Sequence, residues 1–145
     1  MKINNVVIIG SGTMGSGIAA HLCNANIPVT LLDLKTEISS QARDKIFNSR
    51  PPLLLDKTKI NNIKVGNIVD DFNLVKDADW IVEAVVERID IKHNIYEKIF
   101  KEKKKEAIVS SNTSSIPIKI LSQHLTAEEK KDFCITHFFN PVRYM

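Results

Sequence analysis

Long apolar runs and a strong charge imbalance are missing from this chain of 145 residues. No apolar segment approaches the roughly 20 residues that a membrane-spanning helix requires. The apolar stretch near the N-terminus also lacks the small-residue cleavage site of a secretory signal. These absences argue against a membrane or secreted protein, and we expect a cytoplasmic protein with no membrane partner.

Cysteine is scarce, and Cys23 and Cys134 lie far apart in apolar surroundings without metal-ligand spacing. We therefore expect two buried free thiols, with no catalytic role and no bound metal. The net charge of +3 at pH 7 is mild. The densest basic run, KEKKKE at 101–106, alternates with glutamate at the end of a helical pattern. A solvated helix end explains this run better than a nucleic-acid-binding surface does.

The composition that is present, 43% hydrophobic and 26% charged, is typical of a soluble globular protein. The length suits one domain, residues 1–145. Short apolar runs alternate with amphipathic helical patterns, which predicts an α/β fold with a doubly wound, mostly parallel sheet. Strands are expected at residues 3–9, 29–32, 60–65, from 80 onward, 107–112 and 133–139. Helices are expected at 13–24, 36–48, 70–79, from about 90 onward and at 114–125.

The segment GSGTMG, residues 10–15, follows the first expected strand and opens the first expected helix. Its glycines match the G-x-G-x-x-G pattern of a dinucleotide-binding turn. In that pattern Gly10 permits the tight turn, Gly12 lets a pyrophosphate approach the backbone, and Gly15 allows close packing of helix on strand. We expect this turn, with Thr13 and Met14, to bind the cofactor at the helix N-terminus.

Asp33 ends the second expected strand at close to the roughly 20-residue spacing of this fingerprint. Its carboxylate can accept hydrogen bonds from ribose hydroxyls and would repel a 2′-phosphate, so NAD is favoured over NADP. Lys35 nearby weakens this preference slightly. Two alternatives stay open: a plain strand-to-helix turn followed by a polar strand end, and an FAD site, which uses the same turn.

Three further segments follow the ends of expected strands: EAVVERIDIK, SSNTSS and HFFNP. Open α/β sheets bind ligands at this edge, so we expect the three segments to lie together. Each is ambiguous alone. Glu83, Glu87 and Lys92 are also compatible with an ordinary acidic strand end and a solvated helix residue. Ser114 or Ser115 is also compatible with a helix cap.

Four segments together, VIIGSGTMGSGIA, DADWIVEAVVERIDIK, IVSSNTSSIPI and THFFNPVRYM, resemble the NAD-binding domain of the L-3-hydroxyacyl-CoA dehydrogenase family. The resemblance covers essentially the whole chain. The segments PPLLLDKTKINNIKVGNI and FFNPVRYM are most similar in sequence to a bacterial long-chain subgroup, in which this domain begins a multidomain polypeptide. The resemblance implies a Rossmann-type fold, NAD as cofactor, and oxidation of 3-hydroxyacyl-CoA to 3-ketoacyl-CoA in fatty-acid β-oxidation.

The resemblance also implies site residues. Glu87 and Lys92 match contacts to the nicotinamide half of NAD, and Ser114 matches a serine near both cofactor and substrate oxygen. His137 matches the catalytic base, and Asn140 matches an asparagine that positions the reacting groups and the cofactor. An imidazole suits this chemistry because its pKa lies near working pH, although a lone histidine at a strand end is more often structural.

The family's CoA contacts lie partly on the helix after the second strand, where Ser49 is a candidate. Arg43, Lys45 and Arg50 are candidates for the CoA phosphates, with solvated surface charge as the alternative for each. The remaining histidines, which lack support from any motif, are expected to be surface or packing residues: His21, His93 and His124.

The family pairs its catalytic histidine with a glutamate shortly after HFFNP, but no acidic residue follows His137 in this sequence. An imidazole without a carboxylate partner is a weaker base.

The family also adds a C-terminal helical domain, which closes over the acyl chain and supplies most of the dimer contact. We therefore expect part of a catalyst, truncated before that domain and dependent on it or on a second chain. A homo-oligomer is one expected assembly, and the sequence leaves the oligomeric state open. The alternative is a non-catalytic NAD-binding module or a remnant of a split gene.

Overall fold

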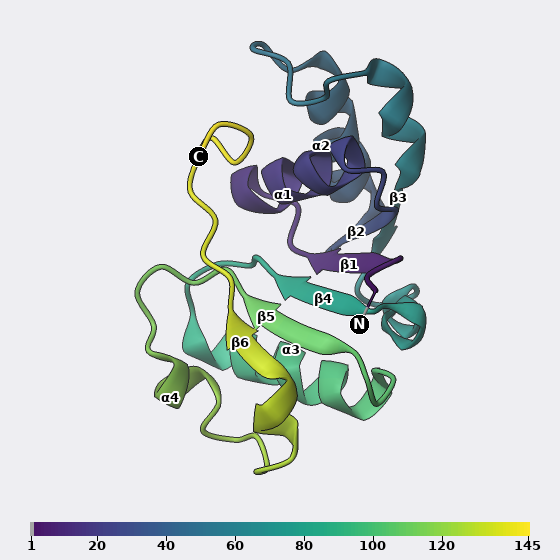
Figure 1. Ribbon diagram of the computed structural model, residues 1–145. Helices are drawn as coiled ribbons and strands as arrows, with labels where there is room; N and C mark the ends of the chain where they lie inside the picture. The colour runs from purple at the N-terminus through teal and green to yellow at the C-terminus, as the bar shows by residue number, and fades with distance from the viewer. Residues whose placement is uncertain (1) are drawn as a thin grey trace.

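A computed structural model describes residues 2–145, which form one six-stranded sheet with helices on both faces (Figure 1). Neighbouring strands are all parallel, in the order β3-β2-β1-β4-β5-β6. The strands are β1 (Val6–Ile9), β2 (Val29–Asp33), β3 (Ile63–Asn67), β4 (Trp80–Glu83), β5 (Ile108–Ser111) and β6 (Phe133–Ile135). The helices are α1 (Thr13–Asn24), α2 (Thr36–Asn48), α3 (Ile89–Glu102) and α4 (Ile118–Leu121), with short 3-10 turns η1 (Lys57–Asn62), η2 (Phe72–Asp77) and η3 (Glu129–Asp132).

The unbroken apolar character of β1 serves two hydrophobic cores. Val6 and Ile8 point to the face covered by α1 and α2, whereas Val7 and Ile9 point to the face covered by α3. Successive residues of a strand face opposite sides of the sheet, and helices cover both sides here, so all four side chains are buried. The strand order reverses between β1 and β4, and a sheet of this kind binds ligands at such a switch point.

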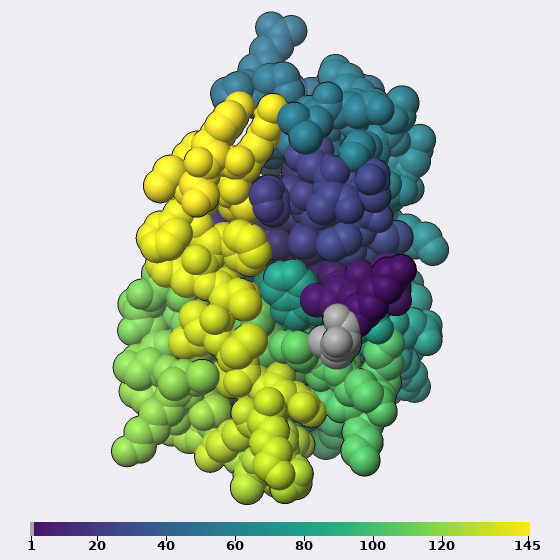
Figure 2. Space-filling model, in the orientation of Figure 1, coloured from purple at the N-terminus to yellow at the C-terminus, as the bar shows by residue number. Residues whose placement is uncertain are grey.

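The chain after β6 crosses back over the sheet edge and lies along α1 (Figure 1). Figure 2 shows these last residues, in yellow, against the blue atoms of the first helices. A side chain at Gly17 would come within 2.9 Å of Val142, so the helix offers a flat surface there. Arg143 Nη1 donates to the carbonyl oxygen of Pro52. The C-terminal segment thereby packs against α1 and the loop after α2.

The predicted fold class is confirmed, and the differences lie in the bounds of elements. β1 begins at Val6 rather than residue 3, and β3 begins at Ile63 because Ile60 belongs to η1. The short helix expected at 70–79 is the 3-10 turn η2, which covers only Phe72–Asp77, and α4 is a single turn. β6 ends at Ile135, four residues earlier than expected, because the following residues leave the sheet toward α1.

The basic run only partly matches the predicted solvated helix end: Lys101 lies in the last turn of α3 with its side chain 69% exposed, but the lysines after the helix are paired. α3 ends at Glu102, and the side chain of Lys103 is only 6% exposed with Nζ 2.9 Å from Asp132 Oδ2. Lys104 Nζ lies 2.5 Å from Asp79 Oδ1. These ion pairs connect the loop after α3 to the residues before β6 and before β4. The periodicity of the sequence gives no information about such pairs.

Cys23 is buried as expected, but Cys134 is only half-buried because it lies on the short edge strand β6. Burial raises the pKa of Cys23 to about 11 and also raises the pKa of Cys134, which disfavours the reactive thiolate at both positions. In residues 2–145, no helix combines the length and apolar character needed to cross a bilayer. Within the same range, no three His, Cys, Asp or Glu side chains are grouped to hold a metal ion.

Candidate functional site

The glycine turn leaves the start of α1 open to a ligand. Gly10 has a φ of 102°, which an L side chain rarely adopts, and a Cβ added at Gly15 would overlap the carbonyl oxygen of Gly10. By contrast, a Cβ added at Gly12 would meet no atom within 4 Å. No side chain in the described part of the chain caps α1 at Gly12. The first amides of the helix therefore face free space, as an anion-binding helix N-terminus requires.

Asp33 is held beside this turn by Ser11. Its Oδ2 accepts hydrogen bonds from the Ser11 amide at 2.7 Å and the Ser11 hydroxyl at 2.6 Å. Its Oδ1 accepts from the Leu34 amide at 2.7 Å. A carboxylate has about four acceptor sites, so Oδ1 keeps a lone pair for a ribose hydroxyl. The turn thus orients the acid that the sequence fingerprint identified.

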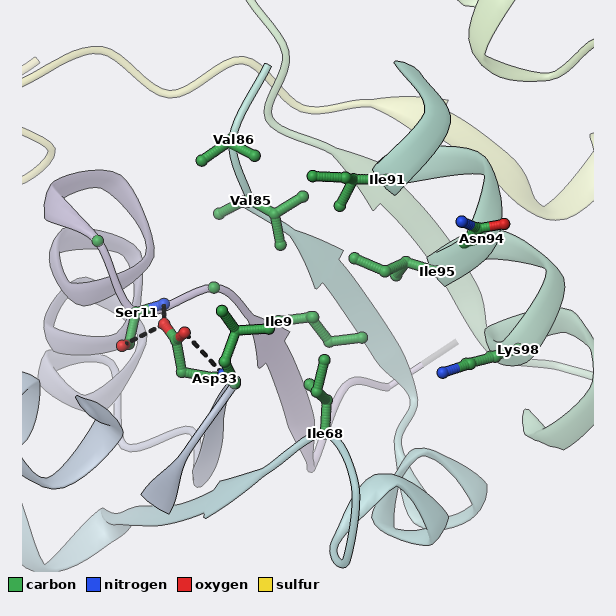
Figure 3. A pocket seen from close by; sticks show the side chains of 14 residues that line it. Ile9, Ser11, Asp33, Ile68, Val85, Val86, Ile91, Asn94, Ile95 and Lys98 are labelled. Atoms are coloured by element: carbon green, nitrogen blue, oxygen red, sulfur yellow. Dashed lines mark hydrogen bonds between the residues drawn. The ribbon is translucent and has the colours of Figure 1, made fainter. Parts of the chain in front are cut away.

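A cavity of about 440 Å³ lies at the C-terminal ends of β1, β2 and β4 (Figure 3). Ile91 and Ile95 of α3 face Val85 across this cavity, and Ile68 lies on the side next to Asp33 (Figure 3). Apolar walls with one carboxylate at the edge suit a flat heterocycle joined to a ribose. We call this the adenine cavity.

A second cavity, of about 350 Å³, lies on the other side of Ala84 and Val85, which line both spaces. We call it the catalytic cavity. It brings together six of the predicted site residues, namely Met14, Glu87, Lys92, Ser114, His137 and Asn140. The glycine turn borders both cavities, because Gly10 and Gly12 line the adenine cavity and Met14 lines the catalytic cavity. An extended dinucleotide therefore has a path along the sheet edge.

Glu87 is fixed at the wall of the catalytic cavity by donors from two segments. Its Oε1 accepts from the Thr113 hydroxyl, the Ser115 hydroxyl at 3.1 Å and the Ser114 amide at 3.2 Å. Its Oε2 lies 3.1 Å from Lys92 Nζ. Burial pushes the pKa of Glu87 upward, but the hydrogen bonds from Thr113 and Lys92, the Lys92 charge and the Ser115 hydrogen bond outweigh it and lower the pKa from 4.5 to about 2. Glu87 is therefore an anion at neutral pH.

Behind Glu87 lies a fully buried polar network centred on Glu83. Glu83 Oε1 accepts from Lys92 Nζ at 2.7 Å and from the Val85 amide at 2.9 Å. Its Oε2 accepts from the Tyr96 and Ser111 hydroxyls, each at 2.6 Å. Burial, together with the Glu83 charge, raises the pKa of Tyr96 far above its ordinary value, so the hydroxyl remains a donor. Four donors saturate this carboxylate, which makes its burial tolerable.

The three residues predicted to act on the substrate are exposed to the catalytic cavity: Ser114, His137 and Asn140. The histidine rings that form hydrogen bonds within residues 2–145 are those of His93 and His124. The His137 ring instead lies 4.5 Å from the Phe139 ring, centroid to centroid. Its nitrogens are thus free to meet a ligand, and no carboxylate of the described chain orients them.

The predicted CoA residues lie apart from the catalytic cavity. Lys45 and Ser49 line a cavity of about 520 Å³ between α1 and α2, which Thr13 also borders. The Ser49 hydroxyl already donates to the Ile46 carbonyl at 2.9 Å and accepts from the Leu53 amide at 2.8 Å. That leaves it a single lone pair for a ligand. The CoA role of Ser49 stays a prediction.

The two arginines of that prediction differ in their surroundings. Arg50 is exposed, whereas Arg43 is half-buried and donates to the Ile60 carbonyl at 3.3 Å. Neither lines the cavity between α1 and α2. Their proposed contacts with CoA phosphates also stay predictions.

Sequence reasoning missed three residues that hold the site together. The sequence patterns give no role to Ser11 or Thr113, and they leave Glu83 as an acid that is also compatible with an ordinary strand end. One signal was available for Glu83, because it is an acid inside an apolar strand and a lysine follows on the next helix. No comparable signal marks Thr113, since its partner lies 26 residues away.

Comparison with known proteins gives one consistent family. The family model described as 3-hydroxyacyl-CoA dehydrogenase, NAD binding domain, matches residues 5–145. The chain is 42% identical over 151 residues to a Rickettsia felis protein named fatty acid oxidation complex trifunctional enzyme, covering 99% of this chain and 21% of that protein. It is 40% identical over 152 residues to a Deinococcus radiodurans protein named 3-hydroxyacyl-CoA dehydrogenase, covering 100% of this chain and 44% of that protein.

The fold leads to the same group of proteins. The crystal structure of 3-hydroxybutyryl-CoA dehydrogenase from Escherichia coli matches with a TM-score of 0.87 at 29% identity, covering 100% of this chain and 31% of that one. The chain thus spans less than half the length of each of these three relatives. The family match covers nearly the whole chain, and the predictions of family and of NAD as cofactor are confirmed. This chain belongs to the family of 3-hydroxyacyl-CoA dehydrogenase NAD-binding domains.

Proposed function

We propose that the chain supplies the cofactor domain of an NAD-dependent L-3-hydroxyacyl-CoA dehydrogenase, which oxidises 3-hydroxyacyl-CoA to 3-ketoacyl-CoA in fatty-acid β-oxidation. The observation that carries the proposal is the pair of cavities that share the Ala84–Val85 wall. One is apolar and has Asp33 at its edge, and the other contains His137, Glu87 and Ser114. A dinucleotide that fills both would bring its reactive end to the imidazole.

The residues present fit NAD. The open space above Gly12 admits a pyrophosphate, the free amides at the start of α1 face it, and Asp33 offers an acceptor to the ribose. Glu87 and Lys92 would hold the nicotinamide half. When bound, NAD supplies the hydride acceptor, so the protein needs only to bind, orient and move a proton.

His137 is proposed to accept the proton of the substrate hydroxyl. Its ring nitrogens are free of hydrogen bonds to the other described residues, and the ring lies in the cavity lined by Ser114 and Asn140. These two polar side chains are suited to hold the substrate oxygen while the imidazole acts as general base. Exposure of the cavity works against the reaction, because water competes for the same polar groups.

In the part of the chain that the structure describes, no carboxylate forms a hydrogen bond with His137, and this is the specific observation for a second candidate function. In this alternative the chain is a non-catalytic NAD-binding module. It would bind the cofactor through the glycine turn and Asp33 and would transfer no hydride.

A binding experiment and a turnover experiment separate the two functions. Binding is measured by titrating NADH into the chain and following nicotinamide fluorescence. Turnover is measured as NADH loss with acetoacetyl-CoA at saturating cofactor, for the chain alone and after adding the C-terminal region of a relative. Activity that appears only with the added region supports the enzyme, and binding without turnover in both samples supports the module.

Two variants test the role of His137 in that assay. His137→Ala should lower the turnover rate by about a hundredfold or more, which is the magnitude expected for loss of a general base. NADH should still bind to this variant. His21→Ala, an exposed histidine of α1 outside both cavities, is the matched control and should keep full activity. Undiminished turnover in His137→Ala would refute the base assignment.

A further inference from the structure

The wall of the catalytic cavity has more negative than positive charge. Lys92 Nζ lies 2.7 Å from Glu83 Oε1 and 3.1 Å from Glu87 Oε2, so one ammonium faces two carboxylates. The nearby Arg88 adds no net charge, because its guanidinium is paired with Asp90 at 2.7 Å and both side chains are largely exposed. One negative charge is therefore left unbalanced at this wall.

Glu83 creates the imbalance without being able to meet a ligand. Its side chain is 0% exposed, and its acceptor sites are all taken by Lys92, Val85, Tyr96 and Ser111. It forms a closed pair with Lys92, whose side chain is 1% exposed. The Glu87 side chain, at 37% exposure, is the carboxylate that reaches the cavity.

Charge at this position matters because the nicotinamide ring changes charge in the reaction. Oxidation of the alcohol moves a hydride, which is two electrons and one proton, from carbon to the ring, and the hydroxyl proton goes to the base. The ring is a cation before this transfer and neutral after it. A fixed anion beside the ring therefore stabilises the oxidised cofactor more than the reduced one.

We propose, on the basis of the function proposed above, that Glu83 neutralises Lys92 and so leaves the Glu87 carboxylate as an unbalanced anion that favours NAD⁺ over NADH. Glu83 is then a positioning residue that acts through Lys92, and Glu87 is the group that faces the cofactor. The two carboxylates thereby lower the reduction potential of the bound cofactor.

The expected effect is roughly tenfold in the ratio of the two dissociation constants. This is the size of a single charge interaction over about 5–6 Å at a partly exposed site, where the effective dielectric lies between those of water and a protein surface. A tenfold change in the ratio corresponds to about 30 mV in the potential of a bound two-electron couple.

The test is isothermal titration calorimetry of NAD⁺ and of NADH with the whole chain and its variants. In Glu87→Gln, the ratio of the NAD⁺ to the NADH dissociation constant should rise about tenfold, because only the oxidised ring loses a charge interaction. Glu83→Gln should raise the ratio in the same direction, because Lys92 is then balanced by Glu87. A role of Glu87 in shape or hydrogen bonding alone would weaken both cofactors equally and leave the ratio unchanged.

Two control variants isolate charge from other effects. Tyr96→Phe removes a hydrogen bond to Glu83 without changing charge. Glu97→Gln removes a charge from the exposed face of α3, where the side chain is 66% exposed. Both should leave the ratio within about twofold, since neither alters charge at the cavity.

The outcomes separate this inference from the proposed function. If the wild-type chain binds neither NAD⁺ nor NADH, the proposed function fails. If it binds both and Glu87→Gln leaves the ratio unchanged, the function stands and the charge inference is refuted. Circular dichroism checks that each variant folds. If Glu83→Gln does not fold, Glu87→Gln still decides the test, because Glu87 is partly exposed at the cavity wall.

Discussion

Replacing Lys92 by methionine tests whether the buried charge network stabilises the fold. Methionine keeps the length and the apolar stem of lysine but removes the ammonium. The side chains of Lys92 and Glu83 are 1% and 0% exposed, with Nζ 2.7 Å from Glu83 Oε1. The variant therefore leaves a carboxylate buried among hydrogen-bond donors without a countercharge.

Breaking a buried pair by removing one partner costs about 3–5 kcal/mol. Three neutral donors still bind Glu83 in the variant, from Val85, Tyr96 and Ser111, so we expect the lower end of this range. A loss of about 3 kcal/mol, at a urea m-value of about 2 kcal/mol per M, lowers the unfolding midpoint by about 1.5 M. The assay is equilibrium urea denaturation followed by circular dichroism at neutral pH.

Lys101→Met is the matched control on the same helix. Lys101 and Glu97 form an ion pair at 2.7 Å, but their side chains are 69% and 66% exposed. Its loss should cost at most about 0.5 kcal/mol. The double variant Glu83→Gln with Lys92→Met should be more stable than Lys92→Met alone, because no buried charge is left unpaired. Equal losses in Lys92→Met and Lys101→Met would refute the claim that burial makes the network matter.

Four further predictions concern the glycine turn and the acids of the site. Gly12→Ala should leave the unfolding free energy within about 0.5 kcal/mol of wild type, because the added Cβ contacts no other atom of the protein. The same Cβ occupies the space expected for the pyrophosphate, so NADH binding in a fluorescence titration should weaken. Gly15→Ala should cost about 2 kcal/mol or more in the same urea assay, because its Cβ overlaps the Gly10 carbonyl; equal stability of the two variants would contradict this account. Asp33→Ala should narrow the gap between NAD and NADP affinities, and an unchanged gap in calorimetry would count against the ribose contact. Glu87 has a folded pKa of about 2 against an ordinary 4.5, so its stabilising contribution is complete above pH 4.5 and is lost as the pH falls toward 2. In acid titrations, the stability difference between wild type and Glu87→Gln should shrink over that range, and a constant difference would refute the assignment.

Much of the fold could be predicted from local sequence because its signals are short-range. The apolar strand, the glycine turn and the helical spacing from Thr13 to Asn24 all agree, so the bounds of the first helix and the end of the first strand were predicted to the residue. Ile60 was misplaced in a strand because 3-10 turns have no periodicity of their own. The end of β6 was missed because Phe138 and Phe139 continue the apolar pattern of the strand. In the structure the chain leaves the sheet after Ile135 and reaches α1, where Val142 lies against Gly17.

Sequence alone determined the architecture and the residue types at the sheet edge, because a parallel sheet brings the ends of its strands together whatever their partners are. Tertiary structure decided how those residues are connected. It showed that Ser11 orients Asp33, that Thr113 fixes Glu87, and that Glu83 pairs with Lys92. These contacts join residues on different elements, and their strength depends on how deeply they are buried. Neither the pairing nor the burial can be inferred from the spacing of residues along the chain.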